Sequence, residues 1–287
     1  MGVAMTVYLR EDIAAQWRGR DPFVVADQLQ GEVYRSVKTR RTLRFETGGK
    51  TYFIKIHHGV GWSEILKNLI SVRLPVVSAR QEWLAIGRLT ELGVPTMSVA
   101  GFGERGWNPA HRDSFLITDE LTDTVSLETL CARWPQGRPG FVFKRRLLEQ
   151  VAHISRRLHG NGVCHRDFYL CHFLLHCPPG GEPDPGAEPK LSVIDLHRAM
   201  IRDTLSPRWI EKDIAGLYFS SFGIGLTKTD LLRFLTLYTG LPLREALVVH
   251  APFIRRIQAR ANKTWRRDQR KLARARSDAP AANNGGS

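Results

Sequence analysis

The run His165-Arg166-Asp167-Phe168-Tyr169-Leu170-Cys171-His172 opens the thirty-one residues that decide the fold, and Leu191-Ser192-Val193-Ile194-Asp195 closes them. The stretch contains two carboxylates of interest, Asp167 and Asp195, which lie 28 residues apart. Upstream, apolar residues recur every three to four positions, which predicts a helix over residues 143–159. An Asn-Gly pair ends that helix, so Asp167 falls in the loop that follows it.

Asp195 follows the second of two short apolar segments. Residues 173–175 are apolar enough for a buried strand, and residues 191–194 read as its partner. Between them, residues 178–190 are rich in proline and glycine, which favours a solvent-exposed loop. The sequence therefore predicts a small hairpin with both carboxylates at one end.

Two carboxylates placed in this way suit phosphoryl transfer, in which a protein mainly positions groups and neutralises charge. Asp167 can accept the proton of an acceptor hydroxyl. Asp195 can hold a magnesium ion, which prefers oxygen ligands. The alternative, that both are turn or capping aspartates, is the common one for single aspartates. Here the flanking helix and strand pattern favours the chemical interpretation.

Two further charged residues fit the same chemistry. Residues 31–46 form an extended run that turns at a Gly-Gly pair and returns as residues 51–56, which predicts antiparallel strands. Alternation places Lys55 on the face opposite its apolar neighbours, directed either toward nucleotide phosphates or toward solvent. A helix pattern over residues 78–89 carries Glu82, which either pairs with Lys55 or is a surface residue.

Lys55, Glu82, Asp167 and Asp195 occur in the order of the eukaryotic-type protein kinase signature. Three segments, beginning at His165, Val193 and Glu211, resemble more specifically the lipopolysaccharide core heptose(I) kinases of Gram-negative bacteria: His-Arg-Asp-Phe-Tyr-Leu-Cys-His-Phe-Leu-Leu, Val-Ile-Asp-Leu-His-Arg and Glu-Lys-Asp-Ile-Ala-Gly-Leu. This resemblance extends over residues 20–262. It implies ATP- and magnesium-dependent phosphorylation of a heptose hydroxyl in the lipopolysaccharide inner core, with Asp167 as the catalytic base.

The resemblance also implies an α+β, bilobal protein-kinase-like fold with an antiparallel-sheet N-lobe and a mainly helical C-lobe. We expect an N-terminal extension, a nucleotide-covering N-lobe, a catalytic C-lobe and a basic C-terminal tail, over residues 1–19, 20–121, 122–262 and 263–287. The implied nucleotide-binding residues lie in the covering strand, the lysine–glutamate pair and the hinge: Gly31, Arg35, Lys55, Glu82, Glu120 and Leu121. Asp195 is the implied metal ligand.

His172 departs from the protein-kinase pattern, because an asparagine that binds a metal usually stands five residues after the catalytic aspartate. Imidazole nitrogen suits magnesium less well than oxygen does. Two interpretations stay open. Either His172 is at most a poor second metal ligand, with the second ion absent or held otherwise, or it orients Asp167.

Only 17 residues separate Asp195 from Asp213, and they contain no Ala-Pro-Glu motif. Protein kinases place a longer, peptide-docking segment there, so the short segment favours a sugar or another small acceptor. Asp213 itself resembles the helix aspartate that braces the catalytic loop of kinases.

Composition sets wider limits. With 287 residues, of which 43% are apolar, the chain can bury a substantial core. Its cysteines show neither paired nor metal-binding spacing, which indicates reduced thiols in a cytosolic protein: Cys131, Cys164, Cys171 and Cys177. The N-terminus lacks the charge order of a signal peptide, and no apolar run approaches the about 18 residues that span a bilayer. We expect a cytoplasmic protein that is peripheral at the inner membrane.

Residues 255–276 hold ten lysines and arginines against one acid, Asp268, and so carry +9 of the formal net charge of +14. Apolar residues fall on one face there, which predicts a basic amphipathic helix that packs through Trp265. Such a surface attracts anionic lipid headgroups, a phosphorylated glycolipid or an acidic carrier protein, with nucleic acid less favoured. Residues 61–75 are a second candidate surface, for which ordinary packing on the small lobe is the favoured alternative. Residues 279–287 are expected to be disordered.

Two rival functions remain open from the sequence. One is a kinase of the same fold that acts on a protein side chain or a small metabolite. The other is a catalytically weak kinase relative whose basic tail binds anionic surfaces. Retention of the four charged residues of the signature argues against the second: Lys55, Glu82, Asp167 and Asp195.

Overall fold

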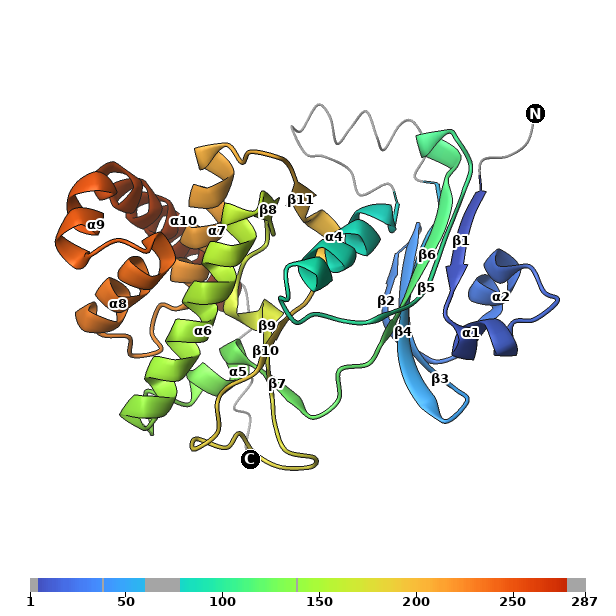
Figure 1. The fold of residues 1–287 in the computed structure, drawn as a ribbon, viewed down its shortest axis with the longest axis horizontal. Coiled ribbons are helices and arrows are strands. Elements are labelled where there is room, and N and C mark those ends of the chain that lie inside the picture. Colours follow the sequence, from blue (N-terminus) through green and yellow to red (C-terminus); the bar gives the residue numbers. More distant parts are fainter. Residues whose placement is uncertain (1–4, 38, 60–77, 138, 278–287) are drawn as a thin grey trace, which may run out of the picture.

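The computed structural model describes residues 5–37, 39–59, 78–137 and 139–277, which form two lobes (Figure 1). An antiparallel sheet dominates the N-lobe, on the right in Figure 1, and helices dominate the C-lobe, on the left. The predicted α+β bilobal fold is therefore confirmed. The candidate surface over 61–75 and the expected disorder over 279–287 lie outside the described residues.

The N-lobe sheet has six antiparallel strands in the order β1-β5-β6-β4-β3-β2. Gly48 and Gly49 connect β3 and β4 with positive φ angles of 57° and 71°, which glycine adopts without steric cost. The strands are β1 (Met5–Leu9), β2 (Glu32–Val37), β3 (Arg40–Thr47), β4 (Lys50–His57), β5 (Val99–Arg105) and β6 (Asp113–Asp119).

One face of this sheet packs on the N-terminal helices α1 (Glu11–Gln16) and α2 (Pro22–Gln28). Ile13 and Trp17 belong to the same buried cluster as the inward residues of β3 and β4. In addition, β1 pairs with β5 along its whole length. Much of the predicted extension over 1–19 is thus an integral part of the N-lobe, because strand pairing and apolar burial tie it to the sheet.

Helix α4 (Arg80–Glu91) lies between the other face of the sheet and the C-lobe (Figure 1). Trp83 stacks on Phe102 of β5, with ring centroids 4.3 Å apart. At its C-lobe side α4 contacts the 3-10 turn η3 (Leu196–Arg198) and β11 (Met200–Ile201). Helix α4 therefore packs against both the sheet and the segment that follows Asp195.

The C-lobe is built around the central helix α6 (Phe141–Gly160), which matches the helix predicted over 143–159. One stripe of α6 is buried, as its spacing predicts. Gly162 lies two residues after α6 and has a φ of 75°, and a Cβ at this position would collide with the Arg202 carbonyl. The other helices are α5 (Leu127–Ala132), α7 (Pro207–Ser220), α8 (Lys228–Thr239), α9 (Leu243–Val249) and α10 (Ala251–Ser277).

Short paired strands connect the helices of the C-lobe. Strands β9 (Phe173–His176) and β10 (Leu191–Val193) form the predicted antiparallel hairpin, and β7 (Thr124–Ser126) adds a third strand. Strand β8 (Val163–Cys164), directly after α6, pairs with β11. Two further 3-10 turns are η1 (Pro109–His111) and η2 (Leu170–His172).

Helix α10 confirms the predicted basic amphipathic helix. Ile257 and Ala261 are buried on the side that packs on α7, whereas its basic residues from Arg255 to Lys271 are exposed. Trp265 contacts Phe222, with ring centroids 5.7 Å apart. The predicted boundary at residue 263 falls inside this continuous helix.

Candidate active site

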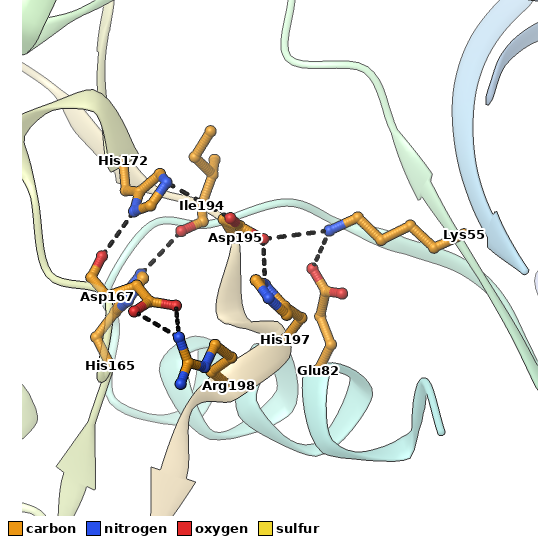
Figure 2. Close-up of polar contacts among 9 residues, drawn as sticks. All are labelled: Lys55, Glu82, His165, Asp167, His172, Ile194, Asp195, His197 and Arg198. Carbon is orange, nitrogen blue, oxygen red and sulfur yellow. Dashed lines mark hydrogen bonds and ion pairs between the residues drawn. The ribbon is translucent and has the colours of Figure 1, made fainter. Parts of the chain in front are cut away.

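Lys55, Glu82 and Asp195 meet in the cleft between the lobes (Figure 2). Alternation along β4 turns Lys55 toward α4, and its Nζ lies 2.6 Å from Glu82 Oε1 and 3.7 Å from Asp195 Oδ1. Glu82 is 1% exposed. A buried carboxylate that fixes an ammonium group in this way presents the cation to the cleft, as the sequence predicted for the pair.

Asp195 leaves β10 with a left-handed φ of 62°, which directs its side chain back into the cleft. Burial alone would raise the pKa of its carboxyl, but a hydrogen bond from His197 and the charges of Lys55, His197 and His172 outweigh that effect. The pKa of Asp195 therefore lies well below its usual range. The carboxylate stays ionised, as a cation ligand requires.

Asp167 lies in the loop after β8, and both of its carboxylate oxygens accept hydrogen bonds from Arg198 Nη1 at 3.1 Å (Figure 2). Arg198 belongs to η3, three residues beyond Asp195. Arg198 therefore links Asp167 to the segment that contains Asp195. An ionised carboxylate fixed beside an arginine can accept a proton from a hydroxyl placed next to it.

Asp213 of α7 braces the loop that carries Asp167. Its carboxylate accepts hydrogen bonds from the backbone N–H groups of His165 at 2.6 Å and Arg166 at 2.8 Å. Burial would raise the pKa of this carboxyl, but the hydrogen bond and charge of His159 and the bond from Cys164 lower it below the ordinary value. The predicted bracing role of Asp213 is confirmed by these contacts.

His172 stands between the two aspartates (Figure 2). Its Nδ1 lies 2.7 Å from the Asp167 carbonyl oxygen, which can only accept, so Nδ1 carries the proton. Its Nε2 lies 3.5 Å from Asp195 Oδ2. The ring therefore contacts the backbone of the Asp167 loop, as the orienting interpretation requires, while its second nitrogen faces the carboxylate of Asp195.

The nucleotide-covering hairpin differs from a glycine-rich loop. Gly31 immediately precedes β2, and a Cβ there would stand 2.1 Å from the Arg44 carbonyl oxygen, so the glycine permits close strand packing. Arg35 is an exposed residue of β2. Arg40, at the start of β3, has a buried Nε without a hydrogen-bond partner, and the carboxylates of Glu82 and Asp195 act on its charge.

The hinge residues follow β6 directly. Glu120 forms a two-point ion pair with Arg44 at 2.8 Å, and its backbone N–H donates to the Thr51 carbonyl. Within the described parts of the chain, the Glu120 carbonyl oxygen accepts no backbone hydrogen bond. The Leu121 N–H donates none there either. Both groups lie at the hinge, where the sequence predicts a contact with an adenine edge.

The structure thus brings together Lys55, Glu82, Asp167, His172 and Asp195. Gly31, Arg35, Glu120 and Leu121 lie on the N-lobe side and the hinge. Sequence reasoning assigned no role to three residues of this site: Arg40, His197 and Arg198. Arg40 is the first residue of β3, so the alternation of that strand could have indicated the face on which its side chain lies. His197 and Arg198 lie in a 3-10 turn, where no periodic pattern indicates the direction of a side chain.

A magnesium ion fits the donor set at Asp195, whose ionised carboxylate can hold the ion together with nucleotide phosphates and water. Among the described residues, no group of three or more histidine, cysteine, aspartate or glutamate side chains is arranged to hold a metal by itself. The donor set therefore suits an ion that arrives with the nucleotide.

The C-lobe also contains an apolar cavity of about 360 Å³, separate from the cleft. Leucine, isoleucine and valine side chains from the C-lobe helices dominate its lining, including Leu147, Val151, Leu217, Leu235 and Ile257. No helix in the described ranges is both long and apolar enough to span a membrane.

Comparisons with known proteins agree with this geometry. Residues 25–238 match the lipopolysaccharide kinase (Kdo/WaaP) family. The lipopolysaccharide core heptose(I) kinase WaaP of Escherichia coli K12 is 50% identical over 265 residues, covering 92% of this chain and 99% of that protein. The enzyme of the same name from Pseudomonas aeruginosa is 49% identical over 266 residues, covering 93% and 98%. A solved structure of WaaP in complex with acyl carrier protein has a TM-score of 0.78 and 44% identity, covering 90% of this chain and 98% of that one.

Proposed function

This chain belongs to the lipopolysaccharide kinase (Kdo/WaaP) family, and we propose that it transfers the γ-phosphate of ATP to a hydroxyl of the first heptose in the lipopolysaccharide inner core. About half of its residues are identical to those of two heptose(I) kinases over nearly their full length. The observation that carries the proposal is the convergence of Lys55, Asp167 and Asp195 on one cleft.

Asp167 acts as the base that receives the proton of the heptose hydroxyl. Arg198 fixes both carboxylate oxygens, so the carboxylate has one orientation before the acceptor arrives. His172 holds the backbone of the same residue through its carbonyl oxygen. Because such preorganisation removes the cost of orienting the base, it lowers the barrier to transfer.

The N-lobe cations meet the nucleotide phosphates. Lys55, held by Glu82, contacts phosphate oxygens. Arg40 supplies a second cation, because its buried Nε has no partner among the described residues and its guanidinium lies within the field of Glu82 and Asp195. Arg35 adds charge at the rim. Arginines on this hairpin thereby replace the backbone amides of a glycine-rich loop.

Asp195 would hold the magnesium ion, which, when bound, neutralises phosphate charge during transfer. Its low pKa keeps the carboxylate available for that role at neutral pH. His172 orients the Asp167 loop rather than serving as a principal ligand, because its imidazole nitrogen suits magnesium poorly.

The segment after Asp195 favours a sugar acceptor over a peptide. It consists of η3, β11 and a short connection to α7, so it forms no long docking segment. Two rival functions are less favoured: a kinase for another acceptor and a weakly catalytic binding module. The two relatives described above, about half identical to this chain over nearly their full length, are heptose(I) kinases.

An acidic carrier protein is the proposed macromolecular partner. A WaaP structure contains acyl carrier protein, and α10 of this chain presents an exposed basic face next to the apolar cavity. The basic face attracts the acidic protein, and the cavity takes an alkyl chain. The same face can attract anionic lipid, which supports the further proposal that the protein acts at the cytoplasmic side of the inner membrane.

Arg266→Glu together with Arg270→Glu tests this docking. The pair should weaken binding of acylated carrier protein, measured by calorimetry, whereas Arg18→Glu with Arg20→Glu on the N-lobe should not. Equal binding by both double variants and the unaltered protein would rule out docking on α10.

Mass spectrometry tests the activity. Purified core oligosaccharide incubated with the protein, ATP and magnesium should gain one phosphate on the first heptose. Asp167→Asn is the negative control, and a phosphate on another residue or no added mass would reject the proposed acceptor.

A further inference from the structure

A cluster of cations lies beside the catalytic loop, on the C-lobe side of Asp167. It consists of the cations Arg166 and Lys212, which lie near the ring of Trp209, and we call these three residues the Trp209 cluster. Arg166 precedes Asp167 in the chain, and the other two residues lie one helical turn apart near the start of α7. The Arg166 guanidinium lies 4.9 Å from the centre of the Trp209 ring, and Lys212 Nζ lies 5.9 Å from it.

Arg166 is a mostly buried residue whose guanidinium contacts the Trp209 ring and has no hydrogen-bond acceptor among the described residues. The residue is 8% exposed and has a φ of 71°, a left-handed conformation that non-glycine residues adopt mainly where the surroundings enforce it. Within the described residues its guanidinium donates no hydrogen bond and forms no ion pair, and its buried Nε has no partner. A guanidinium removed from water in this way is costly unless a ligand supplies the acceptor.

Lys212 is only partly engaged. Its Nζ donates one hydrogen bond, to the Arg166 carbonyl oxygen, and an ammonium group has three donors. Burial lowers the pKa of Lys212, with the charge of Asp167 opposing that effect, and the charges of Arg198 and Arg166 lower it further. Burial and the neighbouring cations therefore disfavour the charged form of Lys212 more than the nearby carboxylates favour it.

The neighbouring carboxylates are already committed. Both oxygens of Asp167 accept from Arg198. Asp213 accepts from two backbone N–H groups and from Cys164, and lies 3.4 Å from His159. Neither carboxylate forms an ion pair with the cations of the Trp209 cluster. Among the residues that the structure describes, Arg166 and Lys212 therefore have no contacting anion, although both lie near Asp167.

We propose that Arg166 and Lys212 form an anion subsite that binds a carboxylate or phosphate group on the acceptor, adjacent to the hydroxyl that receives phosphate. Trp209 provides an apolar ring against which the sugar bearing that group packs. The inference rests on the proposed function, because the lipopolysaccharide inner core is an anionic glycolipid. It makes the protein selective for acceptors whose anion lies beside the reacting heptose.

The test compares three acceptors: intact deacylated core oligosaccharide, the same oligosaccharide with its carboxyl groups reduced to alcohols, and the phosphatase-treated oligosaccharide. For the unaltered protein, KM should rise about tenfold to hundredfold on whichever acceptor lacks the recognised anion. That result also identifies the group as a carboxylate or a phosphate. Equal KM for all three acceptors would overturn the proposal.

Lys212→Met assigns the effect to the subsite. This variant should bind all three oligosaccharides with similar, weakened affinity and bind ATP with unchanged affinity, both measured by calorimetry. Arg244→Gln removes one charge from an exposed position on α9 and should retain the preference of the unaltered protein. Loss of ATP affinity equal to the loss of acceptor affinity would instead mean that Lys212 binds the nucleotide, and would overturn the assignment.

Lys212→Arg covers the case in which the methionine variant does not fold, because it retains the charge and a donor for the Arg166 carbonyl. It should keep the preference among the three acceptors, and Arg166→Gln should lose it. Acceptor binding is measured without turnover, so the subsite can be tested even if no phosphate is transferred. Absent transfer to intact oligosaccharide rejects the proposed function, whereas equal binding of the three oligosaccharides rejects the subsite.

Discussion

Arg198 Nη1 donates to both carboxylate oxygens of Asp167, at 3.1 Å each, although 31 residues separate the two in the chain. Arg198 lies in the 3-10 turn that begins just after Asp195. One short turn therefore links the two carboxylates, because η3 directly follows Asp195 and its Arg198 contacts Asp167. Substitutions of five residues test the proposed site: Asp167, Arg198, Asp195, Arg40 and Asp213.

Asp167→Asn should reduce kcat by roughly 10²–10⁴, because an amide cannot accept the hydroxyl proton. ATP affinity should stay close to that of the unaltered protein, since the nucleotide contacts lie on other residues. Single-turnover kinetics and calorimetry measure the two quantities. Unchanged kcat would mean that Asp167 is not the base.

Arg198→Gln should reduce kcat roughly tenfold to hundredfold while leaving the KM for ATP nearly unchanged, because a loosened base is misplaced rather than lost. Arg198→Lys should recover part of the rate, since it restores the charge without the planar group. Steady-state kinetics of both variants provide the measurement. A lysine variant as slow as the glutamine variant would argue against positioning by charge.

Asp195→Asn should weaken ATP binding in the presence of magnesium by about tenfold or more, because a metal-holding carboxylate is replaced by a neutral amide. Binding of ATP in EDTA should change much less. Calorimetric titrations under the two conditions distinguish loss of the ion from loss of the fold. An equal loss in both conditions contradicts the metal-ligand role.

Arg40→Gln should weaken binding of ATP and ADP about tenfold and leave adenosine binding unchanged, because the lost contact is to phosphate. Arg41→Gln is the matched control, since that neighbouring arginine donates to the carbonyl oxygens of Asp27 and Leu29 instead. Affinities for the three ligands decide the result. A similar loss for adenosine would indicate damage to the hairpin and not a missing phosphate contact.

Asp213→Asn should lower the free energy of unfolding by about 2–4 kcal/mol near neutral pH, because the buried carboxylate accepts charge-assisted hydrogen bonds from the catalytic loop. Its pKa is lower in the folded state than the ordinary value of 3.8. The stabilisation is therefore fully present above about pH 4 and is lost as pH falls through the folded pKa.

Urea denaturation at several pH values measures this dependence. The stability difference between the unaltered protein and Asp213→Asn should be constant from about pH 5 to pH 7 and should shrink below about pH 4. A difference that grows toward acidic pH has the wrong sign and would falsify the assignment of the effect to the Asp213 carboxylate.

The sequence by itself determined the main features that depend on local pattern. The spacing of apolar residues located α6 and the β9–β10 hairpin, and alternation along β4 placed Lys55 on the face opposite its apolar neighbours. The approximate positions of Asp167 and Asp195 followed, because Asp167 lies in the loop region after α6 and Asp195 lies just beyond β10. The amphipathic character of α10 could be read in the same way.

Only the tertiary structure decided which side chains meet across the chain. The pairing of β1 with β5 draws the N-terminal residues into the sheet, and no local pattern encodes that partner. The contact of Arg198 with Asp167 and the absence of an acceptor for Arg166 within the described residues arise from how η3 and α7 pack on the catalytic loop. Periodicity fixes the face of an element, whereas the choice of partner depends on long-range packing, which one sequence does not display.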